Sequence, residues 1–195
     1  MKPTKLIFLL LSLLALLPEK TSAQSGIVGQ KAVRITVGTV DGFSFLSSDQ
    51  RRMFHAGIAY TRCNRNRSRW VIGAEYLHKD YRYKRYAIPK AQFTGEAGYY
   101  VPLAGDRRKN IVLSLGLSAL AGYETSNWGN KRLPDGATLT NEDGMLYGGA
   151  LSAEVEAALC ERLALVVNIR QRALGGSSLG AFHTLFGLGF KFTFN

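Results

Sequence analysis

The sequence predicts an all-β fold: an eight-stranded antiparallel up-and-down β-barrel of the outer-membrane type. Eight segments alternate between apolar residues and small or polar residues, as strands do when their two faces meet different environments. The connections between these segments alternate in length, which gathers short turns at one rim and long loops at the other. The sequence also ends with an aromatic segment in which six apolar residues share one parity: Phe182, Phe186, Leu188, Phe190, Phe192 and Phe194.

The first 23 residues are organised like a secretory signal. Lys2 and Lys5 precede an apolar run over residues 6–17, which is too short to span a bilayer, and small residues at 21–23 precede Gln24. We therefore expect a cleaved signal peptide over residues 1–23 and one β-barrel domain over residues 24–195. Export predicts an outer-membrane location, with the periplasm as the alternative.

The exported part of the chain is basic. Its 172 residues contain 22 basic and 13 acidic side chains, a balance that suits anionic lipid or lipopolysaccharide as well as nucleic acid. The charges concentrate in the turns between the alternating segments. No later stretch contains eighteen consecutive apolar residues, so we expect no transmembrane helix.

The first four strands are predicted from short runs of one parity. In the first, Val33, Ile35 and Val37 alternate with Arg34 and Thr36. The second, third and fourth runs begin at aromatic residues and continue with apolar residues at every second position. Their cores lie at residues 54–60, 70–76 and 93–101.

The last four strands follow the same rule, and the fifth is the clearest. Leu113, Leu115 and Leu117 alternate there with Ser114 and Gly116, so we expect the leucines to point outward. The remaining cores lie at residues 145–155, 163–169 and 182–194. Each run has about the nine to eleven residues that a tilted membrane strand needs.

The predicted connections sort into two groups. Short turns are expected at residues 63–69, 102–109 and 159–161, and long loops at 39–52, 78–92 and 125–144. A glycine- and serine-rich connection of intermediate length is expected at 172–180. Aromatic residues near the strand ends predict interfacial girdles: Tyr60, Trp70, Tyr76, Tyr99, Tyr100, Tyr123 and Tyr147.

Several of these segments resemble the TraO family, the conjugal-transfer proteins of Bacteroides-type conjugative transposons. The matching stretches keep their order along the chain: GAEY at 73–76, TGEAGY at 94–99, GDRRK at 105–109, LSALAGYET at 117–125 and DGA at 135–137. The resemblance implies membership of a DNA-transfer apparatus at the cell envelope. It implies no catalytic residue.

The parity opposite to the apolar one predicts the interior of the barrel. It carries six charged residues for which we expect a structural network of ion pairs: Arg34, Glu75, Glu96, Glu154, Arg170 and Lys191. Glu156, His55 and His183 share this parity. Because unpaired charges are costly in a medium of low dielectric constant, the acids and bases should pair. An eight-stranded interior is just wide enough for side chains, so we expect no conducting pore.

The sequence predicts no catalytic, cofactor or metal site. His55 and His183 have no HxH, HExxH or CxxC context that would favour a metal or proton site, and no GxSxG motif provides a hydrolase nucleophile. Cys63 and Cys160 fall in turns on opposite sides of the predicted barrel. That separation exceeds the roughly 7 Å that a disulfide allows between Cα atoms, so we expect none.

Basic residues crowd the first two short turns. Arg65 and Arg67 stand in one, Arg107 and Arg108 in the other, and all four are candidates for contact with an acidic partner, with lipid phosphates or with passing DNA. A merely solvated charged rim is the alternative.

We expect a non-enzymatic outer-membrane component of a conjugative DNA-transfer apparatus that anchors or contacts envelope proteins. Its partners would be outer-membrane lipid and other conjugation proteins; neither direct DNA contact nor a small-molecule substrate is expected. The alternatives are an outer-membrane enzyme that modifies lipid and a soluble periplasmic β-barrel that binds a small apolar ligand.

Overall fold

Eight strands close into a single barrel in which β8 pairs back with β1. The structure is a computed structural model that describes residues 28–41, 53–83, 86–106, 110–129, 143–177 and 181–194. The strands are β1 Lys31–Val40, β2 Met53–Cys63, β3 Arg69–Tyr83, β4 Tyr86–Gly105, β5 Ile111–Ser126, β6 Gly144–Cys160, β7 Leu163–Gly175 and β8 Phe182–Phe194; a 3-10 turn, η1 Asn127–Gly129, follows β5. Every pairing is antiparallel, so the predicted fold class is confirmed and a two-sheet sandwich is excluded.

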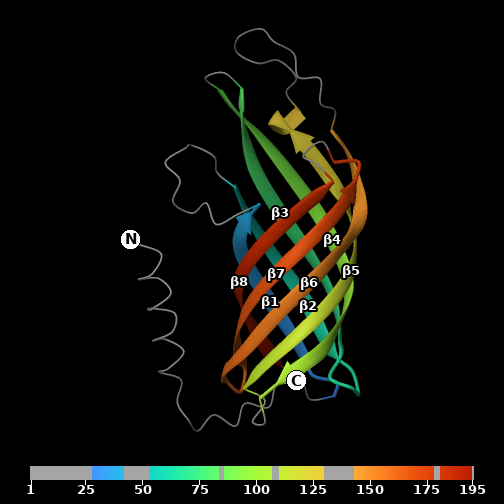
Figure 1. Ribbon diagram of the computed structural model, residues 1–195, viewed down its shortest axis with the longest axis vertical. Helices are drawn as coiled ribbons and strands as arrows, with labels where there is room; N and C mark the ends of the chain where they lie inside the picture. Colours follow the sequence, from blue (N-terminus) through green and yellow to red (C-terminus); the bar gives the residue numbers. More distant parts are fainter. Residues whose placement is uncertain are drawn as a thin grey trace, which may run out of the picture.

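The connections sort onto two rims, as predicted. The strand ends that flank the short connections, after β2, β4 and β6, form the short-turn rim at the bottom of Figure 1, where β1 also begins and β8 ends. The other connections lie at the opposite rim. No helix within the described residues is long and apolar enough to cross a membrane.

The predicted long loop at residues 78–92 is wrong. β3 continues to Tyr83 and β4 begins at Tyr86, and the two strands stay paired in register from Lys79 with Lys90 to Tyr83 with Tyr86. The hairpin extends past the other strands at the top of the barrel (Figure 1). Backbone hydrogen bonds between strands need no apolar side chains. The apolar alternation in the sequence therefore ends before the paired strands do.

Other strands also extend beyond their predicted ends. β4 passes Pro102 through a β-bulge and ends at Gly105, and β7 includes residues 172–175, which the sequence assigned to a connection. β3 to β6 have 15, 20, 16 and 17 residues rather than nine to eleven. The predicted parities are nevertheless correct, because an error at a strand end does not change which face its side chains occupy.

The outer face of the barrel is apolar. Leu117 is 69% exposed, and Phe190 and Phe192 also point outward. Aromatic side chains meet near both rims: the Trp70 and Tyr99 rings have centroids 4.9 Å apart, and those of Tyr76 and Phe93 are 5.0 Å apart. Such a surface is unfavourable in water and favourable in lipid.

Tyr100 does not belong to the predicted girdles. Its side chain is fully buried inside the barrel, because it shares the parity of Glu96 and not that of Tyr99. The two cysteines, at the last positions of β2 and β6, are both free thiols; Cys63 is buried and Cys160 is exposed.

Candidate functional site

The structure places the six predicted interior charges inside the barrel. Arg34, Glu96, Glu154, Arg170 and Lys191 are buried, and the Glu75 side chain is only 9% exposed. Each comes from the inward parity of its strand. The question for the site is how these charges are compensated.

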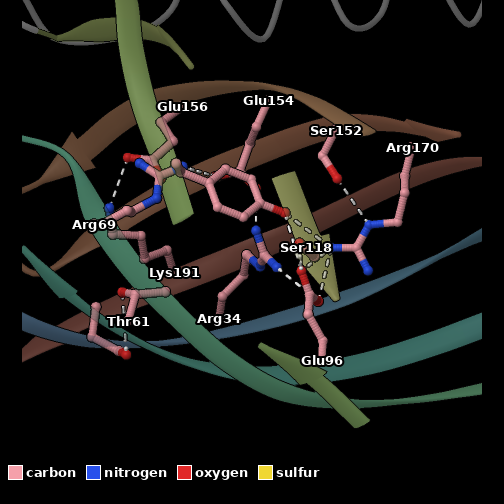
Figure 2. Close-up of polar contacts among 12 residues, drawn as sticks. Arg34, Thr61, Arg69, Glu96, Ser118, Ser152, Glu154, Glu156, Arg170 and Lys191 are labelled. Atoms are coloured by element: carbon pink, nitrogen blue, oxygen red, sulfur yellow. Dashed lines mark hydrogen bonds and ion pairs between the residues drawn. The ribbon is translucent and has the colours of Figure 1, made fainter. Parts of the chain in front are cut away.

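At the short-turn end, two glutamates of β6 are shared among three cations. Glu156 accepts from Lys191 Nζ at 2.7 Å and lies 2.8 Å from Nη1 of Arg69. Glu154 is ion-paired with both Arg69 and Arg34. Figure 2 shows these carboxylates beside the guanidinium groups of Arg69 and Arg34, which come from β3 and β1.

Toward the long-loop end, Arg170 of β7 joins two further glutamates. Its Nη2 lies 2.7 Å from Glu96 Oε1, and its Nη1 lies 3.0 Å from Glu75 Oε2. Arg172 Nη1 lies 2.9 Å from the other oxygen of Glu75. Arg34 Nη2 approaches Glu96 at 4.0 Å, which links the two halves. The ion pairs between β7 and β3 join strands four apart in the eight-stranded ring, so they cross the lumen.

These contacts form one alternating series, which we call the interior ion-pair chain. Every glutamate in it lies between two cations, so each of its four carboxylates is compensated. Its members, in order from the short-turn end, are Lys191, Glu156, Arg69, Glu154, Arg34, Glu96, Arg170, Glu75 and Arg172. A buried charge is tolerated when it is paired in this way.

The interior ion-pair chain and its packing include three residues that the sequence does not predict there. Arg69 and Arg172 were assigned to connections, although each continues the inward parity of its strand by one step: Arg69 ahead of Val71, and Arg172 behind Arg170. Tyr100 was assigned to the outer girdle. The alternation continued past the apolar runs places Arg69 and Arg172 inside, and the parity within residues 93–101 places Tyr100 there.

Tyr100 packs between the two halves of the chain. Its ring centroid lies 5.6 Å from the guanidinium carbon of Arg34 and 5.2 Å from that of Arg69, and its hydroxyl accepts from Arg170 Nη2 at 3.0 Å. A Cβ atom on Gly116 would come within 2.5 Å of this ring. Glycine is therefore required opposite Tyr100, and the ring fills the centre of the lumen.

A cavity of about 510 Å³ lies at the short-turn rim, and we call it the mouth cavity. The exposed residues Arg65 and Arg67 line it from the turn at 64–68, and Pro102 and Asp106 lie among its other wall residues. Arg69, Glu156 and Lys191 of the interior ion-pair chain also line it. Of the four predicted rim residues, the structure therefore brings Arg65 and Arg67 to one cavity. Arg107 and Arg108 lie outside the described residues.

A second polar cluster lies at the opposite rim, around Asp41. This carboxylate, directly after β1, accepts from Lys79 Nζ at 2.8 Å and from the Thr184 amide at 3.1 Å, and lies 3.0 Å from His183 Nδ1. Partial burial acts to raise the pKa of Asp41, but the hydrogen bonds from Lys79, His183 and Thr184 together hold it below its ordinary value.

The lowered pKa of Asp41 predicts a loss of local stability in acid. A group whose pKa is depressed in the folded protein stabilises it above the unfolded-state pKa, and this contribution is lost as the pH falls through the folded-state pKa. We expect hydrogen exchange at the Thr184 amide to accelerate below the ordinary aspartate range, beyond the intrinsic pH dependence of exchange. Asp41→Asn should remove that added dependence. Equal pH dependence in both proteins would contradict this assignment.

Within the described residues, no group of three or more His, Cys, Asp or Glu side chains is placed to hold a metal ion. His55 and His183 both lie inside the barrel and are buried. His183 contacts Asp41 at the rim, as described above.

Solved structures with similar folds come from outer-membrane proteins. Neisserial surface protein A of Neisseria is 13% identical, with a TM-score of 0.56 over 85% of this chain and 96% of that one. OprG of Pseudomonas aeruginosa is 12% identical, with a TM-score of 0.54 over 88% and 98% of the two chains. Ail of Yersinia pestis, solved with the heparin analogue sucrose octasulfate, is 13% identical, with a TM-score of 0.50 over 86% and 100%. At such identities the likeness concerns the fold alone.

The sequence itself matches one family model across nearly its whole length. No curated protein matches the chain. The model described as "Conjugative transposon protein TraO" matches residues 27–194, which include all eight strands and both rims. The chain therefore belongs to the TraO family of conjugative transposon proteins.

Proposed function

We propose that this TraO-family protein is a non-enzymatic outer-membrane barrel of a conjugative DNA-transfer apparatus, in which it anchors or contacts other envelope proteins. The observation that carries the proposal is the pairing of an apolar outer face with a lumen filled by the interior ion-pair chain. Such a barrel suits lipid outside and offers no path through its centre. Its contribution to transfer would therefore be made at its rims.

The outer membrane is the compartment that fits this surface. Apolar side chains on every strand face outward, and Trp70, Tyr99, Tyr76 and Phe93 provide aromatic contacts near the two rims. A signal peptide over residues 1–23 would deliver the mature chain, residues 24–195, to the periplasm for assembly. Outer-membrane lipid would then contact the whole circumference.

The rims are where protein partners would bind. At the short-turn rim, Arg65 and Arg67 are exposed beside the mouth cavity, and Arg107 and Arg108 follow Asp106 in the sequence. In an outer-membrane barrel the short turns face the periplasm, where other proteins of the apparatus are accessible. Conjugation proteins are thus the proposed partners of this rim, with neither DNA nor a small-molecule substrate required.

The filled lumen predicts very low conductance. The ion pairs between β7 and β3 cross the interior, and the Tyr100 ring occupies its centre. We expect planar-bilayer recordings of the purified protein to show no large steady channel. A wide, constantly open channel would contradict a lumen closed by side chains.

The proposed function is tested by location and by mating. Density fractionation should place the protein with outer-membrane markers, and the unboiled protein should migrate differently from the boiled one on a denaturing gel. Deleting its gene from the transposon should reduce transfer, and a plasmid copy should restore it. A protein found free in the periplasm, or a deletion that transfers at the normal frequency, would refute the proposal.

A further inference from the structure

The interior ion-pair chain contains one more cation than anion. Five cations alternate with four glutamates, so both ends of the series are positive: Lys191 at the short-turn end and Arg172 at the other. A separate ion pair inside the barrel joins Lys90 to Glu124, one cation and one anion, at 4.0 Å. Within the interior ion-pair chain, the excess positive charge lies at its two ends.

The two ends differ in access. Arg172 is fully buried and donates to Glu75 and to the Thr94 hydroxyl. Lys191 is also buried, at 4% exposure, but it lines the mouth cavity. Its ammonium has three N–H donors, and among the described residues one of them donates to Glu156. The ammonium can therefore donate further hydrogen bonds to a ligand in the cavity.

The cavity wall adds two more cations on a turn whose backbone is hydrogen-bonded. The turn that carries Arg65 and Arg67 is closed by hydrogen bonds from the Asn64 amide to the Ser68 carbonyl, 2.7 Å, and from the Arg67 amide to the Asn64 carbonyl, 3.1 Å. Glu156 in the same wall is already shared by Arg69 and Lys191. The volume of about 510 Å³ falls within the range of about 300–1,000 Å³ typical of ligand pockets.

We propose that the mouth cavity binds a carboxylate-bearing segment of a partner protein, with Lys191 as the deep contact and Arg65 and Arg67 as the outer ones. The inference rests on the proposed function, because it presumes that the short-turn rim meets proteins in the periplasm. A bound carboxylate would extend the alternating series by one anion and balance its five cations. Charge-assisted hydrogen bonds from an ammonium and two guanidinium groups are suited to a carboxylate.

The position of the cavity favours a peptide over the other anions of the envelope. Lys191, Arg69 and Glu156 line the cavity from the inward faces of their strands, whereas lipid head groups surround the outside of a barrel. The acids Asp106 and Glu156 in the wall disfavour a polyanion such as DNA, whose binding depends on many phosphate contacts. A short segment with one or two carboxylates enters from the periplasm and needs only the few cations that this wall supplies.

Binding of a defined peptide to the purified full-length barrel in zwitterionic nanodiscs tests the proposal. The probe is a fluorescein-labelled, C-terminally amidated glycine peptide with two aspartates, compared by fluorescence anisotropy with the same peptide carrying asparagines instead. We expect the aspartate peptide to bind more tightly, and its affinity to fall as salt rises. The Arg65→Ser/Arg67→Ser double variant should weaken binding about tenfold. Lys191→Gln should weaken it at least as much, with Lys191→Arg restoring part of the affinity.

The matched control is the Arg62→Ser/Arg162→Ser variant, which removes two exposed arginines of the same rim that do not line the cavity. It should bind like the wild type.

Equal affinity for the two peptides, or equal losses in the two double variants, would overturn the proposal. Displacement of the peptide by vesicles of anionic phospholipid would also overturn it, because the cavity would then be a lipid head-group site. Should Lys191→Gln fail to assemble, as judged by its gel migration, the Arg65→Ser/Arg67→Ser comparison still decides. Failed peptide binding would leave the fractionation and mating results, and hence the proposed function, intact.

Discussion

Replacing Arg170 with alanine is expected to destabilise the barrel by about 3–5 kcal/mol, the usual cost of removing one partner from a buried ion pair. Arg170 donates to Glu96 at 2.7 Å, to Glu75 at 3.0 Å, to the Ser152 hydroxyl at 3.0 Å and to Tyr100 at 3.0 Å. Without it, two carboxylates on different strands lose a cation in the lumen. Urea titration of the folded barrel in lipid, followed by tryptophan fluorescence and gel migration, measures the change in unfolding free energy.

Two further variants separate the loss of the ion pair from a general effect of mutation. Arg162→Ala removes an exposed arginine from the short turn at 161–162 and should change stability by less than about 0.5 kcal/mol. The double variant Arg170→Met/Glu96→Gln also neutralises Glu96, the carboxylate that loses its closest cation. Part of the stability should therefore return. If Arg170→Ala is as stable as Arg162→Ala, the interior ion-pair chain does not stabilise the barrel.

Replacing Leu117 with arginine is expected to prevent assembly in the outer membrane. Leu117 lies in the middle of β5 on the outer face, with Tyr99 and Leu151 as its neighbours on β4 and β6. It is 69% exposed, so the substituted side chain would face lipid rather than the protein. Arginine near the bilayer midplane costs roughly 2–4 kcal/mol in a transmembrane barrel. Quantifying the heat-modifiable form in outer-membrane fractions measures the effect.

The control places the same charge where water surrounds it. Asn66 is exposed at the tip of the turn at 64–68, so Asn66→Arg should assemble at the wild-type level. If Leu117→Arg assembles equally well, this face of β5 does not meet lipid, and a soluble barrel becomes the better description.

Strand number, order and face were all predictable from local sequence. Side chains of a strand alternate between two faces, so Leu117 and Ser118 had to lie on opposite sides whatever the rest of the chain did. The same rule placed Glu96 and Arg170 inside. Tyr100, which shares the parity of Glu96, is buried in the lumen by the same rule.

Strand ends were less predictable. The sequence marks a strand by its alternation of apolar side chains, whereas the strand is extended by backbone hydrogen bonds, which need no apolar side chain. Lys79 and Asp80 pair with Lys90 and Pro89 in the β3–β4 hairpin although their side chains carry no apolar alternation. Arg69 and Arg172 were assigned to connections for the same reason.

By itself, then, the sequence determined the eight strands, the apolar outer face and the charged interior, because each follows from the alternation within a single strand. Only the tertiary structure decided which charges pair and where the chain of pairs ends. Arg170 and Glu75 are 95 positions apart in sequence, and whether they meet at 3.0 Å depends on the registers of all the strands that close the barrel. The mouth cavity arises in the same way, because Arg65, in the turn after β2, and Lys191, in β8, line one space only when the strands have closed into a barrel.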